Sequence, residues 1–180
     1  MLEIVKAPNS VLSQKAKRIV KVDKAVSRLI AGMIESMESA RDPIGVGLAA
    51  PQVGKSLRLF IAKPSKKSKN LVFINPQIVK KIKKEKNPKK EEHKKLEGCL
   101  SLLNIWGEVK RFDSIWVSYL DVAGNKHNRR FDGFMATILQ HEIDHLDGIL
   151  FPKKVLEQKG TLYKSEKDEK GHDVFEEIKI

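Results

Sequence analysis

The run His-Glu-Ile-Asp-His at residues 141–145 constrains this chain more than any other feature of its sequence. Two histidines four residues apart on an α-helix project from one face, so both imidazoles can bind one metal ion. Glu142 lies beside the open coordination position of such an ion, where its carboxylate can take a proton from water. The run therefore predicts a helix that supplies two ligands, His141 and His145, and a general base to a metal-dependent hydrolase.

The sequence around this run supports a helix. Asp132 and Gly133 precede it, apolar residues recur through Phe134 and Ile138, and Gly148 supplies a stop signal. A second amphipathic helix is predicted after Asp23, a residue type that caps helices, and it should end before residues 42–43.

Most of the predicted strands lie between the two helices. Stretches rich in aliphatic, β-branched or aromatic residues are bounded by Pro, Asn, Asp or Gly. They are residues 57–62, 71–74 and 115–120, a strand 127–131 after a hairpin turn at 123–125, and a final strand at 174–180. Strands in a central block with helices on either side indicate an α+β fold, in which antiparallel sheets pack around the helix that carries the motif.

Length and composition indicate one catalytic domain over residues 1–180. The chain is 41% hydrophobic and has no apolar run near the roughly 18 residues that a membrane span needs. Its first residues have no signal-peptide pattern, so we expect a cytoplasmic protein without a membrane partner. The single cysteine, Cys99, cannot form an internal disulfide.

Positive charge is concentrated in residues 63–95. This stretch has thirteen lysines and three glutamates, whereas the formal charge of the whole chain is +12. One hypothesis is contact with ribosomal RNA through salt-dependent attraction. The alternative is a solvated lysine-rich hairpin with a turn at residues 87–88. Aromatic residues are absent from positions 75–95, so base stacking is not indicated there.

A hydrolytic metal site needs a third protein ligand besides the two histidines. One protease class would require a third histidine where this chain has Phe151, so that class is excluded. Glu157 and Glu166 remain available to proteases that use a downstream glutamate. Cys99 is the better candidate, because a thiolate is a strong soft ligand and Gly98 lets the backbone approach the ion.

Three blocks of the sequence resemble the peptide deformylases, which remove the N-formyl group from the initiator methionine of new proteins. They are Gly-Val-Gly-Leu-Ala-Ala-Pro-Gln at residues 45–52, Glu-Gly-Cys-Leu-Ser at 97–101 and Gln-His-Glu-Ile-Asp-His-Leu-Asp-Gly at 140–148. Their order and separations match the family, and the resemblance extends over most of residues 2–151. It implies formyl-methionine nascent peptides as substrates.

The resemblance also implies the metal site. Cys99, His141 and His145 would be the ligands, and Glu142 would move the proton between the attacking water and the leaving amine. One thiolate and two imidazoles suit Fe²⁺, Zn²⁺, Ni²⁺ or Co²⁺. The family favours Fe²⁺ in the cell, with Zn²⁺ or Ni²⁺ often present in purified samples.

The remaining roles follow from the same blocks. Gln52 and the backbone N–H of Leu100 would stabilise the oxyanion that forms at the formyl carbon. The backbone at Val46 and Gly47 would bind the substrate as an added strand. Ile138 lies one helical turn before His141 and would line the pocket for the methionine side chain, although a core residue would have the same pattern.

Glu97 resembles a family glutamate on the substrate side of the site that pairs with a downstream arginine, here Arg111. The alternative is an ordinary surface acid. The chain departs from the family after Ser101, where residues 102–106 replace a proline and an arginine near the exit of the substrate. Trp106 in this stretch either offers an aromatic surface or packs in the fold.

Two other functions remain compatible with the residues alone. A peptide-bond metalloprotease would cleave unformylated peptides and would depend little on Cys99. A basic RNA-binding or ribosome-associated protein with a structural metal would fill all four metal positions, and Glu142 would not matter to its function.

Overall fold

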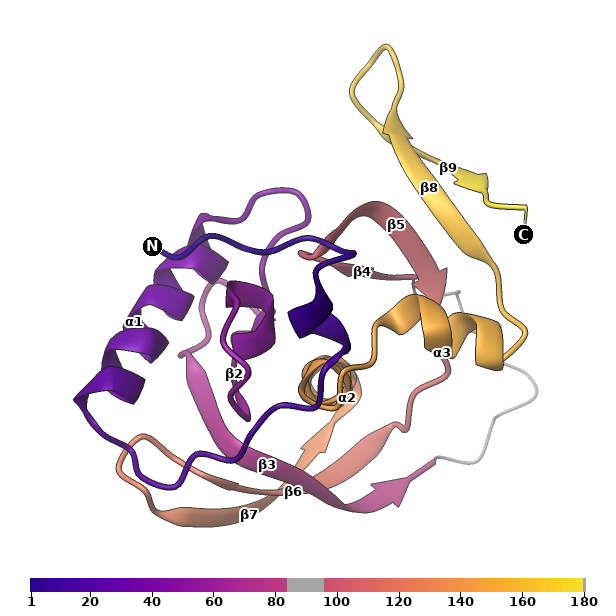
Figure 1. Cartoon of the computed structure of the whole chain (residues 1–180). Coiled ribbons are helices and arrows are strands. Elements are labelled where there is room, and N and C mark those ends of the chain that lie inside the picture. Colours follow the sequence, from indigo (N-terminus) through magenta and orange to yellow (C-terminus); the bar gives the residue numbers. More distant parts are fainter. Residues whose placement is uncertain (84–95, 180) are drawn as a thin grey trace.

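The computed structural model describes residues 1–83 and 96–179. It is an α+β fold with antiparallel sheets, as the sequence predicted. One sheet has the order β1-β2-β3-β6-β7, and the other has the order β4-β5-β8-β9. Figure 1 shows the helix α2 end-on between these sheets, with α1 on the opposite side from α3. The predicted turn at residues 87–88 and the last part of the lysine-rich stretch, residues 84–95, lie outside the described residues.

The five-stranded sheet comes mainly from the central block of the sequence. Its strands are β1 (Gly47–Ala49), β2 (Leu59–Ala62), β3 (Leu71–Ile82), β6 (Ser114–Leu120) and β7 (Lys126–Asp132). The predicted strands at 57–62, 115–120 and 127–131 are confirmed within one or two residues. The strand predicted at 71–74 continues to Ile82, because the later part of β3 pairs with β6 although its side chains are mostly exposed and lysine-rich.

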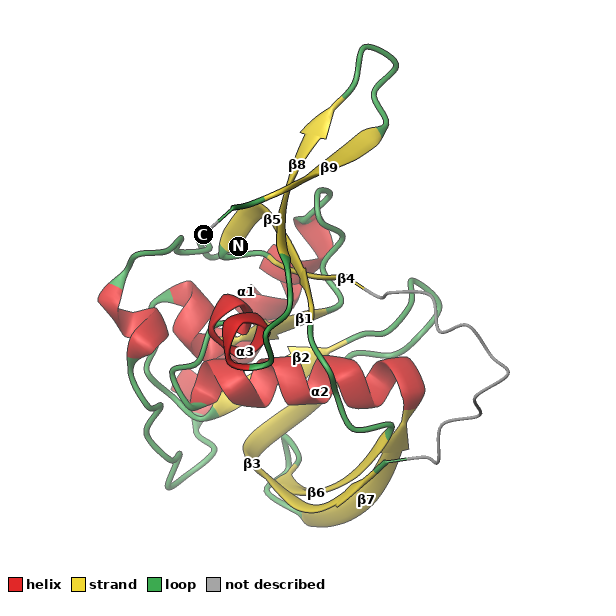
Figure 2. Cartoon of the chain, turned by 90° about the vertical axis from the view of Figure 1, so that its right-hand side faces the viewer, coloured by secondary structure: helices red, strands yellow, loops and turns green. Residues whose placement is uncertain are grey.

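The four-stranded sheet is β4 (Leu96–Cys99), β5 (Leu102–Glu108), β8 (Leu162–Lys167) and β9 (Asp173–Glu177). Of these strands only β9 was predicted. The alternation of β4 and β5 is broken by a register shift after Gly98, and Asn104 has a positive φ of 61°. Local sequence therefore gave no clear strand signal there. Figure 2 shows the hairpin of β8 and β9 standing out from the rest of the fold.

Three helices complete the described fold. α1 (Lys24–Ser39) begins where predicted, and the Asp23 side chain accepts a hydrogen bond from the N–H of Val26 at 2.9 Å. α2 (Gly133–Leu146) carries the motif. α3 (Phe151–Glu157) was not predicted, because seven residues are too few to show a helical period. Within residues 1–83 and 96–179, no helix is both long and apolar enough to cross a membrane.

The core places α2 against the five-stranded sheet. Leu139 of α2 is fully buried with Phe60, Phe73 and Ile115 of the sheet, and the Phe60 and Phe73 rings stack with centroids 4.6 Å apart. Burying a side chain of this size stabilises a fold by about 1.5–3 kcal/mol. This packing determines which face of α2 points away from the five-stranded sheet. His141 and His145 lie on that face, next to β4.

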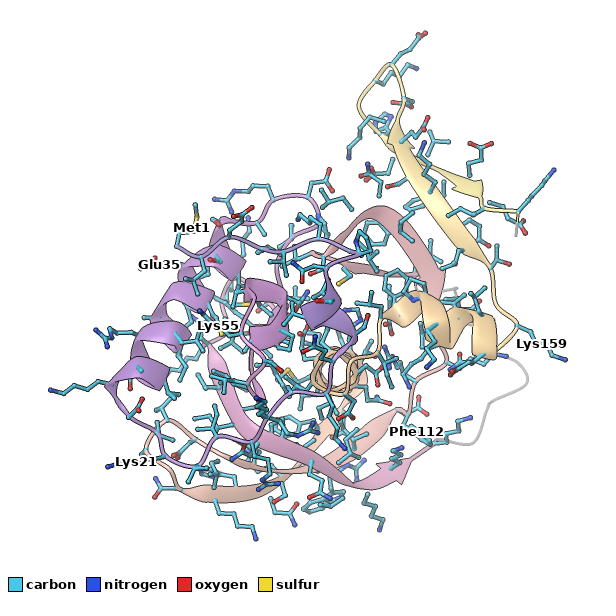
Figure 3. All side chains as sticks on the ribbon, in the orientation of Figure 1. Met1, Lys21, Glu35, Lys55, Phe112 and Lys159 are labelled. Atoms are coloured by element: carbon cyan, nitrogen blue, oxygen red, sulfur yellow. The ribbon has the colours of Figure 1, made fainter. Side chains whose placement is uncertain are left out.

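The N-terminal segment ties α1 to the region of the motif. Figure 3 shows Met1 beside Glu35 of α1, and the terminal amine pairs with that carboxylate. Further along, the N–H of Val5 donates to the carbonyl of Gln52 at 2.9 Å and that of Ala7 to the carbonyl of Ser101 at 3.0 Å. The segment therefore supports two of the sequence blocks that the fold brings together.

Candidate active site

Cys99, at the end of β4, lies against the motif face of α2. The candidate ligand atoms of Cys99, His141 and His145 all lie within 4.8 Å of one another. The Cys99 Sγ is 3.2 Å from the Nε2 of His145. The structure thus brings together the three residues that the sequence nominated as ligands. Glu157 and Glu166, the other carboxylates considered, are not in this group.

The His141 ring is oriented by Glu97. Its Nδ1 lies 3.1 Å from a Glu97 carboxylate oxygen, which leaves Nε2 for a metal ion. Arg111 donates two hydrogen bonds of 2.8 Å to the same carboxylate, so the predicted pair of Glu97 with Arg111 is confirmed. Arg111 also pairs with Asp144 of α2, and all these side chains are largely buried.

Glu97 was predicted among the substrate-binding residues, and in the structure its carboxylate contacts Arg111 and His141. Both of its oxygens are engaged by Arg111 and His141, behind the ligand rather than in front of it. Burial raises the pKa of Glu97, but the hydrogen bonds from Arg111 and His141 outweigh that effect and lower it to about 2. Glu97 is therefore an ionised positioning residue.

The electrostatics of the three candidate ligands suit a cation. Burial raises the pKa of the Cys99 thiol, but the adjacent His145 and His141 lower it well below its usual range. Burial lowers the pKa of His141, whereas Cys99 and Glu97 raise it well above its usual range. A buried anionic sulfur with two imidazoles beside it is a donor set that fits a divalent transition metal.

Glu142 is buried on α2, 4% exposed, and close to Gly47 of β1. Burial raises its pKa to about 7, against the opposing effect of His141 and His145. Its Oε2 has no hydrogen-bond partner within the described part of the chain. A Cβ on Gly47 would lie 2.3 Å from the Glu142 Oε1, so a larger residue at this position would displace the carboxylate.

Gln52 follows β1 in a short 3₁₀ helix, Ala50–Val53, and reaches the same site. Its Oε1 accepts a hydrogen bond of 2.8 Å from the N–H of Ala49. Its Nε2 is thereby turned toward Cys99 Sγ at 3.4 Å and Ser101 Oγ at 3.3 Å. The side-chain amide is held as a donor at the metal site.

Leu100 lies in the turn between β4 and β5, next to Cys99. Its carbonyl accepts a hydrogen bond of 2.7 Å from the Lys6 Nζ. The sequence reasoning missed Lys6, and it also missed the contacts of Ala49 and Ser101 with Gln52. Each of these depends on segments that are distant in sequence, so local patterns carried no signal for them.

Val46 and Gly47, two of the predicted substrate-binding residues, lie at the edge of the five-stranded sheet. β1 is its terminal strand, and the Val46 carbonyl accepts a hydrogen bond of 2.8 Å from the N–H of Lys63 beside β2. Ile138 is 4% exposed and belongs to the core, and Val46 packs against that core.

Trp106 packs in the fold. Its ring covers Gly98, where an added Cβ would lie 2.8 Å from a ring carbon. Its Nε1 donates to the Ser165 Oγ at 2.9 Å, and the Phe175 ring meets it edge-on. Of the two alternatives for Trp106, an aromatic surface or a packed side chain, the structure therefore shows the packed side chain.

Comparisons with known proteins agree with this geometry. The model of the polypeptide deformylase family matches residues 1–160. A peptide deformylase of Symbiobacterium thermophilum is 44% identical over 155 residues, which are 86% of this chain and 66% of that protein. Peptide deformylase 1 of Bacillus cereus is 40% identical, over 86% of this chain and 92% of its own length.

Solved structures give the same result. The crystal structure of the Thermotoga maritima peptide deformylase has a TM-score of 0.74 and 35% identity, covering 86% of this chain and 97% of that one. The peptide deformylase of Synechococcus elongatus in complex with actinonin has a TM-score of 0.73 and 31% identity, covering 88% of each chain. The chain therefore belongs to the polypeptide deformylase family, hydrolases that remove the N-formyl group from newly made polypeptides.

Proposed function

We propose that this chain deformylates formyl-methionine peptides with Cys99, His141 and His145 as metal ligands and Glu142 as the acid/base. The observation that carries the proposal is the convergence of a thiolate, two imidazoles and a buried carboxylate oxygen that has no hydrogen-bond partner among the described residues. A divalent ion held there would activate water and polarise the formyl carbonyl. Fe²⁺ is the proposed ion in the cell, and Zn²⁺, Ni²⁺ or Co²⁺ suit the same ligands.

Glu142 moves the proton in this proposal. It takes a proton as water attacks the formyl carbon, and it delivers that proton to the amine nitrogen as the C–N bond breaks. Formate and a free N-terminal methionine are the products. A carboxylate whose pKa is raised to about 7 by burial can serve in both steps near neutral pH.

Gln52 and the Leu100 backbone N–H stabilise the negative charge on the former formyl oxygen. Gln52 is suited to this because its Oε1 is held by Ala49, so its N–H groups need not reorient during the reaction. The Lys6 side chain donates a hydrogen bond to the Leu100 carbonyl. This bond holds the peptide unit next to the one that contains the Leu100 N–H. Both donors are thus fixed before substrate arrives.

The substrate binds beside β1 as an added strand in this proposal. The free edge of a terminal strand offers unpaired backbone groups to an extended peptide. The Val46 carbonyl bonds to the N–H of Lys63 beside β2, and successive residues of a strand direct their backbone groups to opposite sides. The backbone of Gly47 is therefore proposed to bond to the substrate, with Val46 beside it. Ile138, one turn before His141 on α2, lines the methionine pocket.

A formate-release assay on formyl-Met-Ala-Ser tests this proposal. Glu142→Gln should keep the bound metal and lose activity, whereas Cys99→Ala should lose both, with metal content measured on anaerobically purified samples. Unformylated Met-Ala-Ser is the control. Cleavage of that peptide, or full activity in Cys99→Ala, would favour the metalloprotease alternative instead.

We also propose that residues 1–180 act as one catalytic domain in the cytoplasm, near the ribosome. The support is the lysine-rich stretch at 63–95, of which residues 84–95 lie outside the described structure. In the described part, Lys80, Lys81 and Lys83 are exposed on or next to β3. Cosedimentation with ribosomes should fall when the lysines of this stretch are changed to glutamine. Unchanged cosedimentation would exclude the contact.

A further inference from the structure

The β8–β9 hairpin lies beyond the residues that the family model matches. β8 pairs with β5, and Lys164 is opposite Ile105, so the hairpin extends the sheet that carries Cys99. Trp106 of β5 bonds to Ser165 of β8 through its indole N–H. Figure 1 shows that the other end of the hairpin projects away from the body of the fold. The hairpin thus lies in the sheet whose strand β4 carries Cys99.

Two segments lead from the metal site to this hairpin. The first runs from Gly47, which lies against Glu142, back along the chain to Asp42. The second runs from Cys99 through the turn into β5 and reaches Asn104. An extended chain spans at most about 3.3–3.6 Å per residue, so the five steps along the chain in either segment cover no more than about 18 Å.

Both segments end at one hollow. Asp42 from the first segment and Asn104 from the second line it, together with Lys164, Ser165 and Lys167 of β8. Lys167 also lies 3.5 Å from the Asp42 carboxylate, so the hairpin contacts the first segment as well as β5. The hollow is therefore an open depression bordered by both segments and by the hairpin.

The approach to the hollow is apolar, and its lining is polar. Ile44 on the first segment is 60% exposed, and Leu103 on the second is 48% exposed. Exposed apolar side chains of this size on the two segments suit contact with a peptide. In the hollow, Lys164 pairs with Glu166 at 2.6 Å and Lys167 pairs with Asp173 at 2.6 Å. Because each of these lysines is paired with a carboxylate, the lining should favour neither positively nor negatively charged ligands.

We propose that the hollow binds the main chain of the substrate about three to five residues after the formyl-methionine, and that the hairpin forms a third wall of the substrate cleft. This inference rests on the proposed function. A peptide that extends beside β1 past Gly47 would reach the hollow within that number of residues. The Asn104 amide, the Ser165 hydroxyl and the two lysines can bond to backbone groups of any sequence, which suits an enzyme that acts on many different nascent chains.

The test compares two formylated peptides, formyl-Met-Ala-Ser and formyl-Met-Ala-Ser-Ala-Ala-Ala, on the metal-loaded full chain. We expect the KM of the hexapeptide to be lower than that of the tripeptide by roughly three- to tenfold, the equivalent of about one hydrogen bond. Lys167→Ala and Lys164→Ala should bring this KM ratio toward one. Lys170→Ala, the same change in the turn of the same hairpin but outside the hollow, should leave the ratio unchanged.

Three outcomes would overturn the inference. One is a wild-type enzyme with equal KM values for the two peptides. Another is a ratio that Lys167→Ala and Lys164→Ala do not change, and the third is an equal reduction in all three lysine variants. A wild-type enzyme that releases no formate from either peptide would refute the proposed function itself, a result distinct from these three.

Discussion

Gly47→Ala should inactivate the enzyme through Glu142 while leaving the fold intact. The added Cβ would lie 2.3 Å from the Glu142 Oε1, 2.8 Å from its Cδ and 3.0 Å from its Cγ, whereas ordinary contacts begin near 3.4 Å. The carboxylate must therefore retreat by about 1 Å. Gly47 is not among the residues with a positive φ, so alanine adds no backbone strain.

The expected loss of activity follows from this displacement of the carboxylate. Misplacing a catalytic group by 1 Å costs about 10²-fold in rate, so kcat should fall by about that factor. KM should change by less than about threefold, because the backbone that lies along the substrate is unchanged. Stability should fall by about 1–3 kcal/mol at most, as for other overpacked sites, and less if the flexible Glu142 side chain moves aside.

The assay is formate release from formyl-Met-Ala-Ser by wild type, Gly47→Ala, Glu142→Gln and the double variant, each checked for metal content. If alanine acts only by moving the carboxylate, the double variant should be no slower than Glu142→Gln alone. A Gly47→Ala enzyme that keeps a third or more of the wild-type kcat would refute the reasoning. So would additive losses in the double variant.

Three further predictions concern the surroundings of the site. Cys99→Ser should lower metal occupancy and remove the thermal stabilisation that added metal gives the wild type, measured by metal analysis and melting curves with and without a chelator. Glu97→Gln should cost on the order of 3 kcal/mol at pH 7, because the pKa of Glu97 is about 2 in the fold and near 4.5 when unfolded. This deficit in the free energy of unfolding should shrink as pH falls from about 4.5 to 2, because the wild type loses the contribution of ionised Glu97 over that range. The measurement is denaturation of the metal-free proteins, and a deficit that does not change with pH would contradict the prediction. Lys6→Met should lower kcat more than it raises KM, because the Leu100 peptide loses its support. An unchanged kcat would exclude that role.

The regular elements with strong local patterns were predictable. Helices α1 and α2 and the central strands show their period in the sequence, and Asp23 marks the start of α1. The strands β4, β5 and β8 and the short α3 were missed. Their local patterns are broken by glycine, a register shift or short length, and they are stabilised mainly by pairing with distant segments.

The same distinction applies to the site. The sequence by itself determined the helix with His141, Glu142 and His145 on it, because that geometry follows from helical spacing alone. It also nominated Cys99 through the demand for a third ligand.

Only the tertiary structure decided that Glu97 orients His141, that Gly47 makes room for Glu142, and that the β8–β9 hairpin contacts Asp42. These arrangements join segments far apart in the chain. Their existence depends on how the two sheets pack around α2, which no local pattern encodes.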